Sequence, residues 1–149
     1  MEKAQVRDIM TEEVLTAMPT TLVSEIVKIL NEKGFSGVPI VNEQKELVGL
    51  VTEYELINQR EIIDFLIKDP ESESLHQKVA EMMRMTAQEI MNKEPLTLFI
   101  DDNFEDALLL FNKHHRVNPV PVIAQDKKLV GIVSRYDLIK LLRLYGYSG

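Results

Sequence analysis

The strongest constraint on this chain is an internal repeat. Residues 6–57 align with residues 87–139 at sixteen identical positions, with one single-residue insertion near His115. The identities cluster: Leu-Val-Gly-x-Val stands at 47–51 and again at 129–133, and Tyr-x-Leu-Ile follows each of them. A repeat of this length predicts two copies of one supersecondary unit that bury their apolar faces together.

The first copy indicates a strand, a helix and a hairpin in that order. An apolar run at 15–18 predicts a short strand. Apolar residues at helical spacing over 22–30 predict a helix that ends at Gly34. Two further apolar runs, at 38–41 and 47–51, flank a polar turn and predict an antiparallel hairpin.

A helix is expected directly after each hairpin, from Glu53 and from Arg135. Each copy is therefore β-α-β-β-α, and a single such unit leaves one sheet face poorly covered. The fold class is α+β, with two β-α-β-β-α repeats packed sheet to sheet in pseudo-twofold symmetry and joined by a helical linker. The expected boundaries are 1–58 for repeat 1, 59–86 for the linker and 87–149 for repeat 2.

The linker has no counterpart elsewhere in the chain. Residues 60–68 are expected to prolong the preceding helix until Asp69-Pro70 stops it. Ser74-x-x-Gln77 resembles a capping box and predicts the start of a second helix. Both helices carry too many apolar residues to stand in water, so we expect them to dock on the module or on a partner.

Composition excludes several classes of function. The 149 residues are 45% hydrophobic and 28% charged, as in a globular domain, and a net charge of −7 disfavours nucleic acid. No apolar run approaches the roughly 18 residues that span a bilayer, so no membrane contact is expected. The absence of cysteine suits a cytoplasmic location and removes thiolate ligands, and we expect no metal site. No constellation of residues indicates an enzyme.

The most informative motif joins the end of each hairpin to the following helix. It reads Gly-h-h-Ser/Thr-x-x-Asp/Glu, at 131–137 and at 49–55. A strand that runs into a helix aims free N–H groups and a hydroxyl at one spot, which suits phosphate or a sugar hydroxyl. The same pattern is a capping box, in which the residues satisfy the helix itself. Asp137 is one methylene shorter than Glu55, so we expect capping to explain it less completely.

The duplicated pattern, with Ser-Gly-Val-Pro-Ile-Val-Asn at 36–42 before the first hairpin, resembles a pair of CBS domains, named after cystathionine β-synthase. The resemblance covers about residues 6–58 and 87–143. It implies a Bateman module, a regulatory unit that binds adenosine derivatives such as AMP, ADP, ATP or S-adenosylmethionine in clefts between the repeats. In such modules the carboxylate holds the ribose, the hydroxyl before it holds phosphate, and adenine lies against the segment before the opposite hairpin.

Carried over by position, the resemblance implies two clefts. The stronger cleft would contain Thr20, Phe35, Ser36, Gly37, Val38, Ser134, Arg135, Tyr136 and Asp137. The weaker cleft would contain Thr52, Tyr54, Glu55, Asp101, Val117, Asn118, Pro119 and Val120.

The second cleft departs from the family pattern in three ways. Glu55 replaces the expected aspartate, and Asp101 stands where the other cleft has Thr20, so that a carboxylate would face a phosphate. Pro119 also removes a backbone donor that Gly37 keeps.

A cationic run at 114–116 suggests further contacts. His115 and Arg116 are candidates for phosphate binding, and the alternative is that cations at a helix C-terminus offset the helix dipole. For Arg135 the alternatives are a phosphate contact and solvent.

The sequence thus favours a nucleotide-sensing regulatory module that acts on a separate effector protein by changing conformation, and that forms a homodimer. The alternative is a structural dimerisation module whose clefts are degenerate and bind no ligand.

Overall fold

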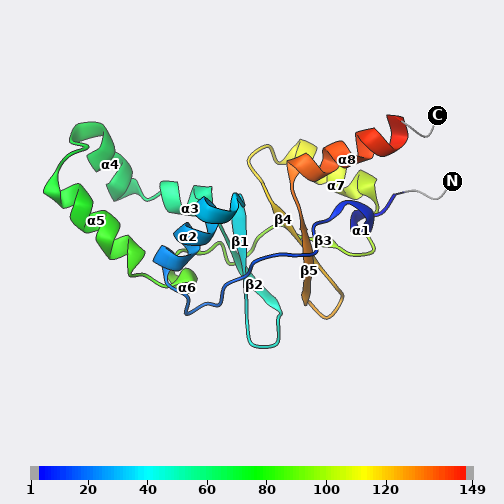
Figure 1. Cartoon of the computed structure of the whole chain (residues 1–149), viewed down its shortest axis with the longest axis horizontal. Coiled ribbons are helices and arrows are strands. Elements are labelled where there is room, and N and C mark those ends of the chain that lie inside the picture. Colours follow the sequence, from blue (N-terminus) through cyan, green and yellow to red (C-terminus); the bar gives the residue numbers. More distant parts are fainter. Residues whose placement is uncertain (1–3, 147–149) are drawn as a thin grey trace. The chain divides into compact units, whose positions relative to one another are not determined.

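The first repeat folds around a buried hairpin (Figure 1). The structure, a computed structural model, describes residues 4–146. Strand β1 (Gly37–Val41) is buried along its whole length and pairs with β2 (Leu47–Thr52), as the two apolar runs around a polar turn predict. Helix α2 (Val23–Lys33) precedes the hairpin and ends at Gly34, whose φ of 69° costs glycine nothing.

The second repeat contains the same elements and one more strand. Strand β3 (Leu98–Phe99) pairs in parallel with β4 (Val120–Ile123), which pairs antiparallel with β5 (Leu129–Val133). Helix α7 (Phe104–Lys113) lies between β3 and β4 in the chain, and α8 (Arg135–Gly146) begins directly after the hairpin as expected.

The strand expected at 15–18 is not formed. Only Ala17 makes a ladder contact there, a parallel bridge to Ile40. Its backbone exchanges hydrogen bonds with Pro39 and Val41 at 3.0 and 2.9 Å, so the segment keeps the position of a strand over one residue.

The chain divides into two compact units, and each unit takes a segment from both repeats. Unit 1 comprises Met1–Val14, Glu43–Leu47 and Glu94–Gly149; unit 2 comprises Leu15–Asn42 and Val48–Lys93. Helix α1 (Val6–Ile9), which opens the first repeat, thus packs in unit 1, and α6 (Ala87–Ile90), which opens the second, packs in unit 2. The sequence boundaries of the repeats stay a prediction.

Backbone hydrogen bonds fix both exchanged segments. In unit 1, Thr11 and Ile132 exchange N–H···O bonds of 2.8 and 3.0 Å, so the segment after α1 pairs with β5. In unit 2, Leu50 and Asn92 exchange bonds of 3.0 and 2.9 Å, so the segment after α6 pairs with β2. Each hairpin therefore gains an extra, very short strand from the other repeat.

Two glycines permit this close approach. A Cβ on Gly131 would lie 2.9 Å from both Met10 Sδ and the Thr11 carbonyl oxygen. A Cβ on Gly49 would overlap the Met91 side chain in the same way. The repeated glycine and the repeated methionine are thus two sides of one contact.

The linker differs from its expectation at two points. Helix α3 (Glu53–Ile57) ends before Asn58, and α4 (Arg60–Lys68) is a separate helix, so the expected continuous helix is wrong. Helix α5 (Glu73–Met83) begins two residues earlier than Ser74 predicts. Ser72 is its N-cap and accepts from the Leu75 N–H at 3.1 Å.

The expected burial of the linker is met only in part. Helices α4 and α5 pack on each other within unit 2, and Leu75 is buried. Phe65 is half-buried, whereas Leu66 is 51% and Ile67 77% exposed. Two large apolar side chains of α4 are therefore exposed in the described part of the chain.

We predict that Gly131→Ala lowers the free energy of unfolding by about 1–3 kcal/mol, because the new methyl group meets the fixed backbone of Thr11. Urea denaturation measures the change. Gly146→Ala is the control, since a methyl group there has no neighbour within 4 Å. Equal stability of the two variants would contradict the role given to Gly131.

Candidate functional site

In unit 1 the motif after β5 forms a closed capping box. Ser134 lies between β5 and α8, and Asp137, on the first turn of α8, is only 4% exposed. Asp137 Oδ2 accepts from the Ser134 N–H at 2.8 Å and from Ser134 Oγ at 3.2 Å. The Asp137 N–H in turn donates to Ser134 Oγ at 3.2 Å.

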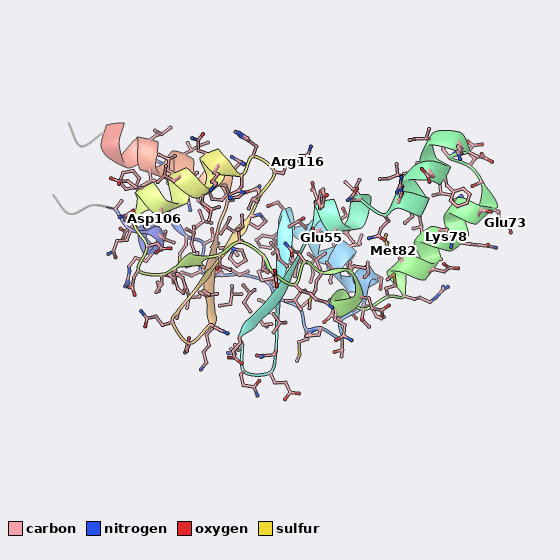
Figure 2. The ribbon with its side chains drawn as sticks, turned by 180° about the vertical axis from the view of Figure 1, so that it is seen from behind. Glu55, Glu73, Lys78, Met82, Asp106 and Arg116 are labelled. Carbon is pink, nitrogen blue, oxygen red and sulfur yellow. The ribbon has the colours of Figure 1, made fainter. Side chains whose placement is uncertain are left out.

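In unit 2 the corresponding box is also closed. Glu55 Oε1 accepts from the Thr52 N–H and from Thr52 Oγ1, both at 2.7 Å, and the Tyr54 N–H donates to Thr52 Oγ1 at 3.2 Å. Glu55 lies on α3 and is half-buried (Figure 2). The expectation that the shorter Asp137 would reach its N-cap less well is wrong, because the two carboxylate–backbone distances differ by little.

The two capping boxes differ in whether the carboxylate also pairs with a cation. Lys140 Nζ lies 2.8 Å from Asp137 Oδ1 and also donates to the Ile9 carbonyl oxygen at 3.3 Å. In the first repeat the aligned position is Asn58, and among the described side chains no cation pairs with Glu55. Sequence reasoning missed Lys140, although its spacing of three residues from Asp137 on a helix was a usable signal.

Arg135 has a role that neither sequence alternative anticipated. Its guanidinium donates to the carbonyl oxygens of His114 at 2.8 Å and Phe111 at 3.3 Å, and it lies 5.2 Å from the Phe111 ring centre. Arg135 thus caps the C-terminal end of α7. Its backbone N–H donates to Asn118 Oδ1 at 2.9 Å. Within unit 1, Asn118 therefore lies beside the start of α8, although sequence reasoning placed the two in different clefts.

The segments before β1 and β4 have matching environments. In each, two half-buried residues lead into a buried strand start: Phe35, Ser36, Gly37 and Val38 in unit 2, and Val117, Asn118, Pro119 and Val120 in unit 1. The two motif tyrosines, Tyr54 and Tyr136, are exposed, as is Thr20 in the turn before α2. These exposed groups are open to a ligand.

Asp101, the carboxylate expected at the position that corresponds to Thr20, has a counter-ion. Asp101 forms an ion pair with Arg7 at 2.5 Å, and both side chains are largely exposed. Because Arg7 balances the charge, the repulsion that we expected between Asp101 and a phosphate is weakened.

His115 and Arg116 lie in the turn after α7 and are exposed. Figure 2 shows the place of Arg116. The helix ends at Lys113. The N–H of its C-cap residue His114 donates to the Leu110 carbonyl oxygen, and Arg135 supplies a cation at this end. Contact with phosphate stays a prediction. The alternative in which His115 and Arg116 offset the helix dipole also stays a prediction.

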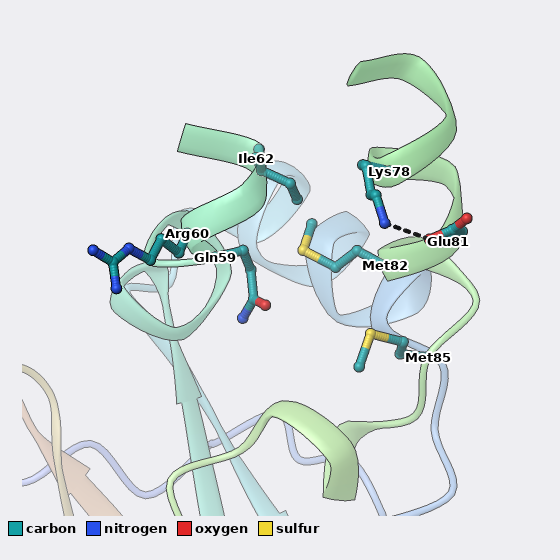
Figure 3. Close-up of a pocket in the computed structure, with 7 residues that line it drawn as sticks. All are labelled: Gln59, Arg60, Ile62, Lys78, Glu81, Met82 and Met85. Carbon is teal, nitrogen blue, oxygen red and sulfur yellow. Dashed lines mark ion pairs between the residues drawn. The ribbon is translucent and has the colours of Figure 1, made fainter. Parts of the chain in front are cut away.

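Unit 2 also contains a half-open cavity of about 190 Å³ between α4 and α5 (Figure 3). Its lining comprises Gln59, Arg60, Ile62, Lys78, Glu81, Met82 and Met85. The side chains of Met82 and Met85 point into it, and the Lys78–Glu81 ion pair of 3.7 Å lies beside them. Gln59 Nε2 donates to the Glu55 carbonyl oxygen at 2.8 Å, which ties this cavity to the capping box of α3.

Two further properties concern residues 4–146 only. Among the side chains that the structure describes in this range, no group of three or more His, Asp or Glu is arranged to hold a metal ion. No helix in the same range is both long and apolar enough to cross a membrane.

The fold and the site thus define a duplicated α+β module. Each copy has a carboxylate on the first turn of the helix that follows its hairpin, Glu55 on α3 and Asp137 on α8. The model of the CBS domain family matches this chain twice, over residues 6–61 and 87–144. The chain belongs to the CBS domain family, as the resemblance implied.

One named relative is itself a CBS domain-containing protein. The chain is 30% identical to CBSX1, a chloroplastic CBS domain-containing protein of Arabidopsis thaliana, over 87% of this chain and 59% of the relative. It is 28% identical to the uncharacterised protein MJ1232 of Methanocaldococcus jannaschii, over 93% of this chain and 39% of that protein. The chain therefore spans only about two-fifths to three-fifths of these relatives.

Solved structures share the fold over nearly the whole chain. CBSX2 from Arabidopsis thaliana superposes with a TM-score of 0.80 at 25% identity, covering 99% of this chain and 100% of CBSX2. A structure of CBSX2 in complex with AMP gives 0.76 at 24% identity, over 96% and 98%. The CBS domain pair of protein MJ0100, in complex with 5′-methylthioadenosine and S-adenosylmethionine, gives 0.69 at 24%, over 99% and 100%.

Proposed function

We propose that this protein is a regulatory module that binds an adenosine derivative and transmits its occupancy to a partner. The observation that carries the proposal is Asp137, a buried carboxylate with a counter-ion at the start of α8, beside the hydroxyl of Ser134. The AMP complex of CBSX2 and the adenosine ligands of the MJ0100 domain pair support this class of ligand.

The chemistry of the site suits a ribonucleotide. A ribose diol offers two O–H donors, and a carboxylate accepts them in charge-assisted hydrogen bonds. Ser134 lies at the N-terminal end of α8, where the helix dipole favours the negative charge of a phosphate. We propose Thr52, Tyr54 and Glu55 as the corresponding, weaker contacts in unit 2.

The adenine contacts remain proposals from the family pattern. The segments before β1 and β4 combine half-buried side chains with buried strand starts, which suits a flat apolar ring. We propose a regulatory rather than a catalytic role, and a cytoplasmic location is the expectation from the sequence.

A structural module without ligand is the second candidate. The observation that favours it is that both capping boxes are closed, so that Asp137 and Glu55 already serve their own helices. A ligand must then compete with hydrogen bonds inside the box.

Thermal unfolding against adenosine, AMP, ADP, ATP and S-adenosylmethionine separates the two candidates. A ligand at a hundred times its dissociation constant adds about 2.7 kcal/mol to the free energy of unfolding. A shift with at least one of these compounds supports the sensor. No shift with any compound supports the structural module.

For the ligand that binds, we predict that Asp137→Ala raises the dissociation constant at least about tenfold, because a charge-assisted hydrogen bond is lost. Glu55→Ala is expected to matter less, since its carboxylate has no cation that anchors it among the described side chains. Isothermal titration calorimetry measures both. The reverse order would contradict the proposed difference between the two sites.

We propose the linker hairpin of α4 and α5 as the element that carries the signal. The cavity between these helices leaves room for them to shift, and Gln59 connects α4 to the Glu55 turn. Movement of a packed helix pair is a common form of conformational switching.

Hydrogen exchange tests this role of the linker. We expect residues 60–85 to change their exchange rates when the best ligand of the thermal panel is added. If those amides exchange at unchanged rates while residues 134–137 become protected, the linker is a spacer.

We further propose a homodimer formed through helix faces. Unit 1 exposes four large apolar side chains on α7 and α8, namely Leu108, Leu109, Ile139 and Leu142. A patch of this kind on a monomer marks an interaction surface.

Light scattering at tens of micromolar is expected to give the mass of a dimer, and Leu142→Glu to shift it towards the monomer because a charge enters the apolar face. Ile67→Glu, which changes an equally exposed side chain on α4, is the matched control and is expected to leave the dimer intact. A monomeric wild-type protein would reject the homodimer.

A further inference from the structure

The carboxylate of Asp137 has an unusual set of partners for a helix-capping residue. One oxygen, Oδ2, accepts two bonds from Ser134, and the other, Oδ1, meets Lys140 Nζ at 2.8 Å. Asp137 is 4% exposed, whereas the Lys140 side chain is 47% exposed. Both oxygens of this buried carboxylate thus have partners. Ser134 binds Oδ2 through its backbone N–H and its hydroxyl, and the Lys140 ammonium pairs with Oδ1.

Counting acceptor sites shows what a diol must displace. A carboxylate has about four lone-pair sites, two on each oxygen. Ser134 fills both sites of Oδ2, while Lys140 leaves one site of Oδ1 open. A diol that places one hydroxyl on each oxygen must therefore displace the Ser134 hydroxyl, which rotates freely, and it does not have to displace Lys140.

The ammonium of Lys140 is itself anchored. Nζ also donates to the carbonyl oxygen of Ile9, at the C-terminal end of α1. Lys140 therefore connects Asp137 to a fixed backbone acceptor, and it adds a second restraint on the rotation of the carboxylate about its Cβ–Cγ bond. Without it, only the two Ser134 bonds to Oδ2 restrain that rotation, and one of them is lost when a diol displaces the Ser134 hydroxyl.

The first repeat provides an internal comparison. Asn58 occupies the place of Lys140, and Glu55 accepts its two Thr52 bonds on the same single oxygen. Its second oxygen has no cationic partner among the side chains that the structure describes. The hydrogen bonds between the carboxylate and its N-cap residue thus occur in both repeats. Among the described side chains, a cation pairs with this carboxylate in the second repeat and not in the first.

We propose that Lys140 is a positioning residue that makes the Asp137 site selective for ribose over 2′-deoxyribose. This inference rests on the proposed nucleotide-binding function. Lys140 holds Oδ1 in place for one hydroxyl of the diol, so that the 2′-hydroxyl and the 3′-hydroxyl bind together. Loss of the lysine costs the discrimination between the two sugars as well as affinity.

Calorimetry with AMP and 2′-deoxy-AMP tests the proposal, because the two probes carry the same phosphate and base. Any general effect of removing a positive charge cancels in the ratio of their dissociation constants. We expect the wild-type protein to prefer AMP about tenfold or more, and Asp137→Ala to lose the preference. Lys140→Met is expected to reduce the preference at least about threefold, and Lys140→Arg to restore it.

Lys128→Met is the matched control, since it removes an exposed lysine of the same unit at the opposite end of β5. Its preference for AMP is expected to equal that of the wild type. Should Lys140→Met fail to fold, Lys140→Gln replaces it, because glutamine keeps a neutral donor but no charge.

The outcomes separate this inference from the proposed function. A Lys140 variant that keeps the wild-type preference, or that weakens both nucleotides equally, overturns the inference while the role of Asp137 stands. A wild-type protein that binds AMP and 2′-deoxy-AMP equally overturns the ribose role of Asp137 and the inference together. A wild-type protein that binds neither probe overturns the choice of AMP as ligand, and with it this assignment.

Discussion

The fold depends on two backbone pairings made over glycine. Thr11 pairs with Ile132 and Asn92 pairs with Leu50, and in both places the absence of a Cβ at Gly131 or Gly49 lets a methionine and a carbonyl group come close. Each pairing satisfies backbone groups on a strand that is otherwise an open edge. It also holds the strand two residues before the helix N-cap. The position of Ser134 and Thr52 thus follows from segments that lie far away in the sequence.

Charge compensation distinguishes the two candidate sites more clearly than residue type does. Asp137 and Glu55 cap their helices with nearly the same geometry, so the substitution of one acid for the other changes little by itself. Lys140 pairs with the first and nothing equivalent meets the second in the described part of the chain. Asp101, which we expected to repel a phosphate, has Arg7 as its counter-ion. A prediction from single charged residues therefore misjudges both sites, because it leaves out the counter-ions Lys140 and Arg7.

The sequence predicted most of the elements because the repeat supplied each of them twice. The helix ending at Gly34 and the helices starting at Glu53 and Arg135 are confirmed. The failures have local causes. Ser72 and Ser74 both fit an N-cap, and the side-chain bond that decides between them is invisible in the pattern. The break at Asn58 carries no proline or glycine, so helical spacing alone did not reveal it.

The sequence motif of the site could be predicted, whereas the tertiary contacts of its residues could not. The duplicated Ser/Thr-x-x-Asp/Glu pattern located both capping boxes, because the spacing of three residues is set by the helix itself. Arg135 on the end of α7 and Asn118 on the start of α8 depend on contacts over 17 to 24 positions in the chain. Such contacts arise from tertiary packing, which a single sequence does not encode in any short motif.

The exchange of α1 and α6 has a consequence for dissecting the molecule. A chain cut within the linker yields one fragment that lacks the partner strand of β2 and another that lacks the partner strand of β5. Neither fragment contains all the parts of a compact unit, yet the two together contain all the parts of both. We therefore expect two halves divided at the linker to fold only when they are combined, and an isolated repeat to lack one short strand of its hairpin's sheet.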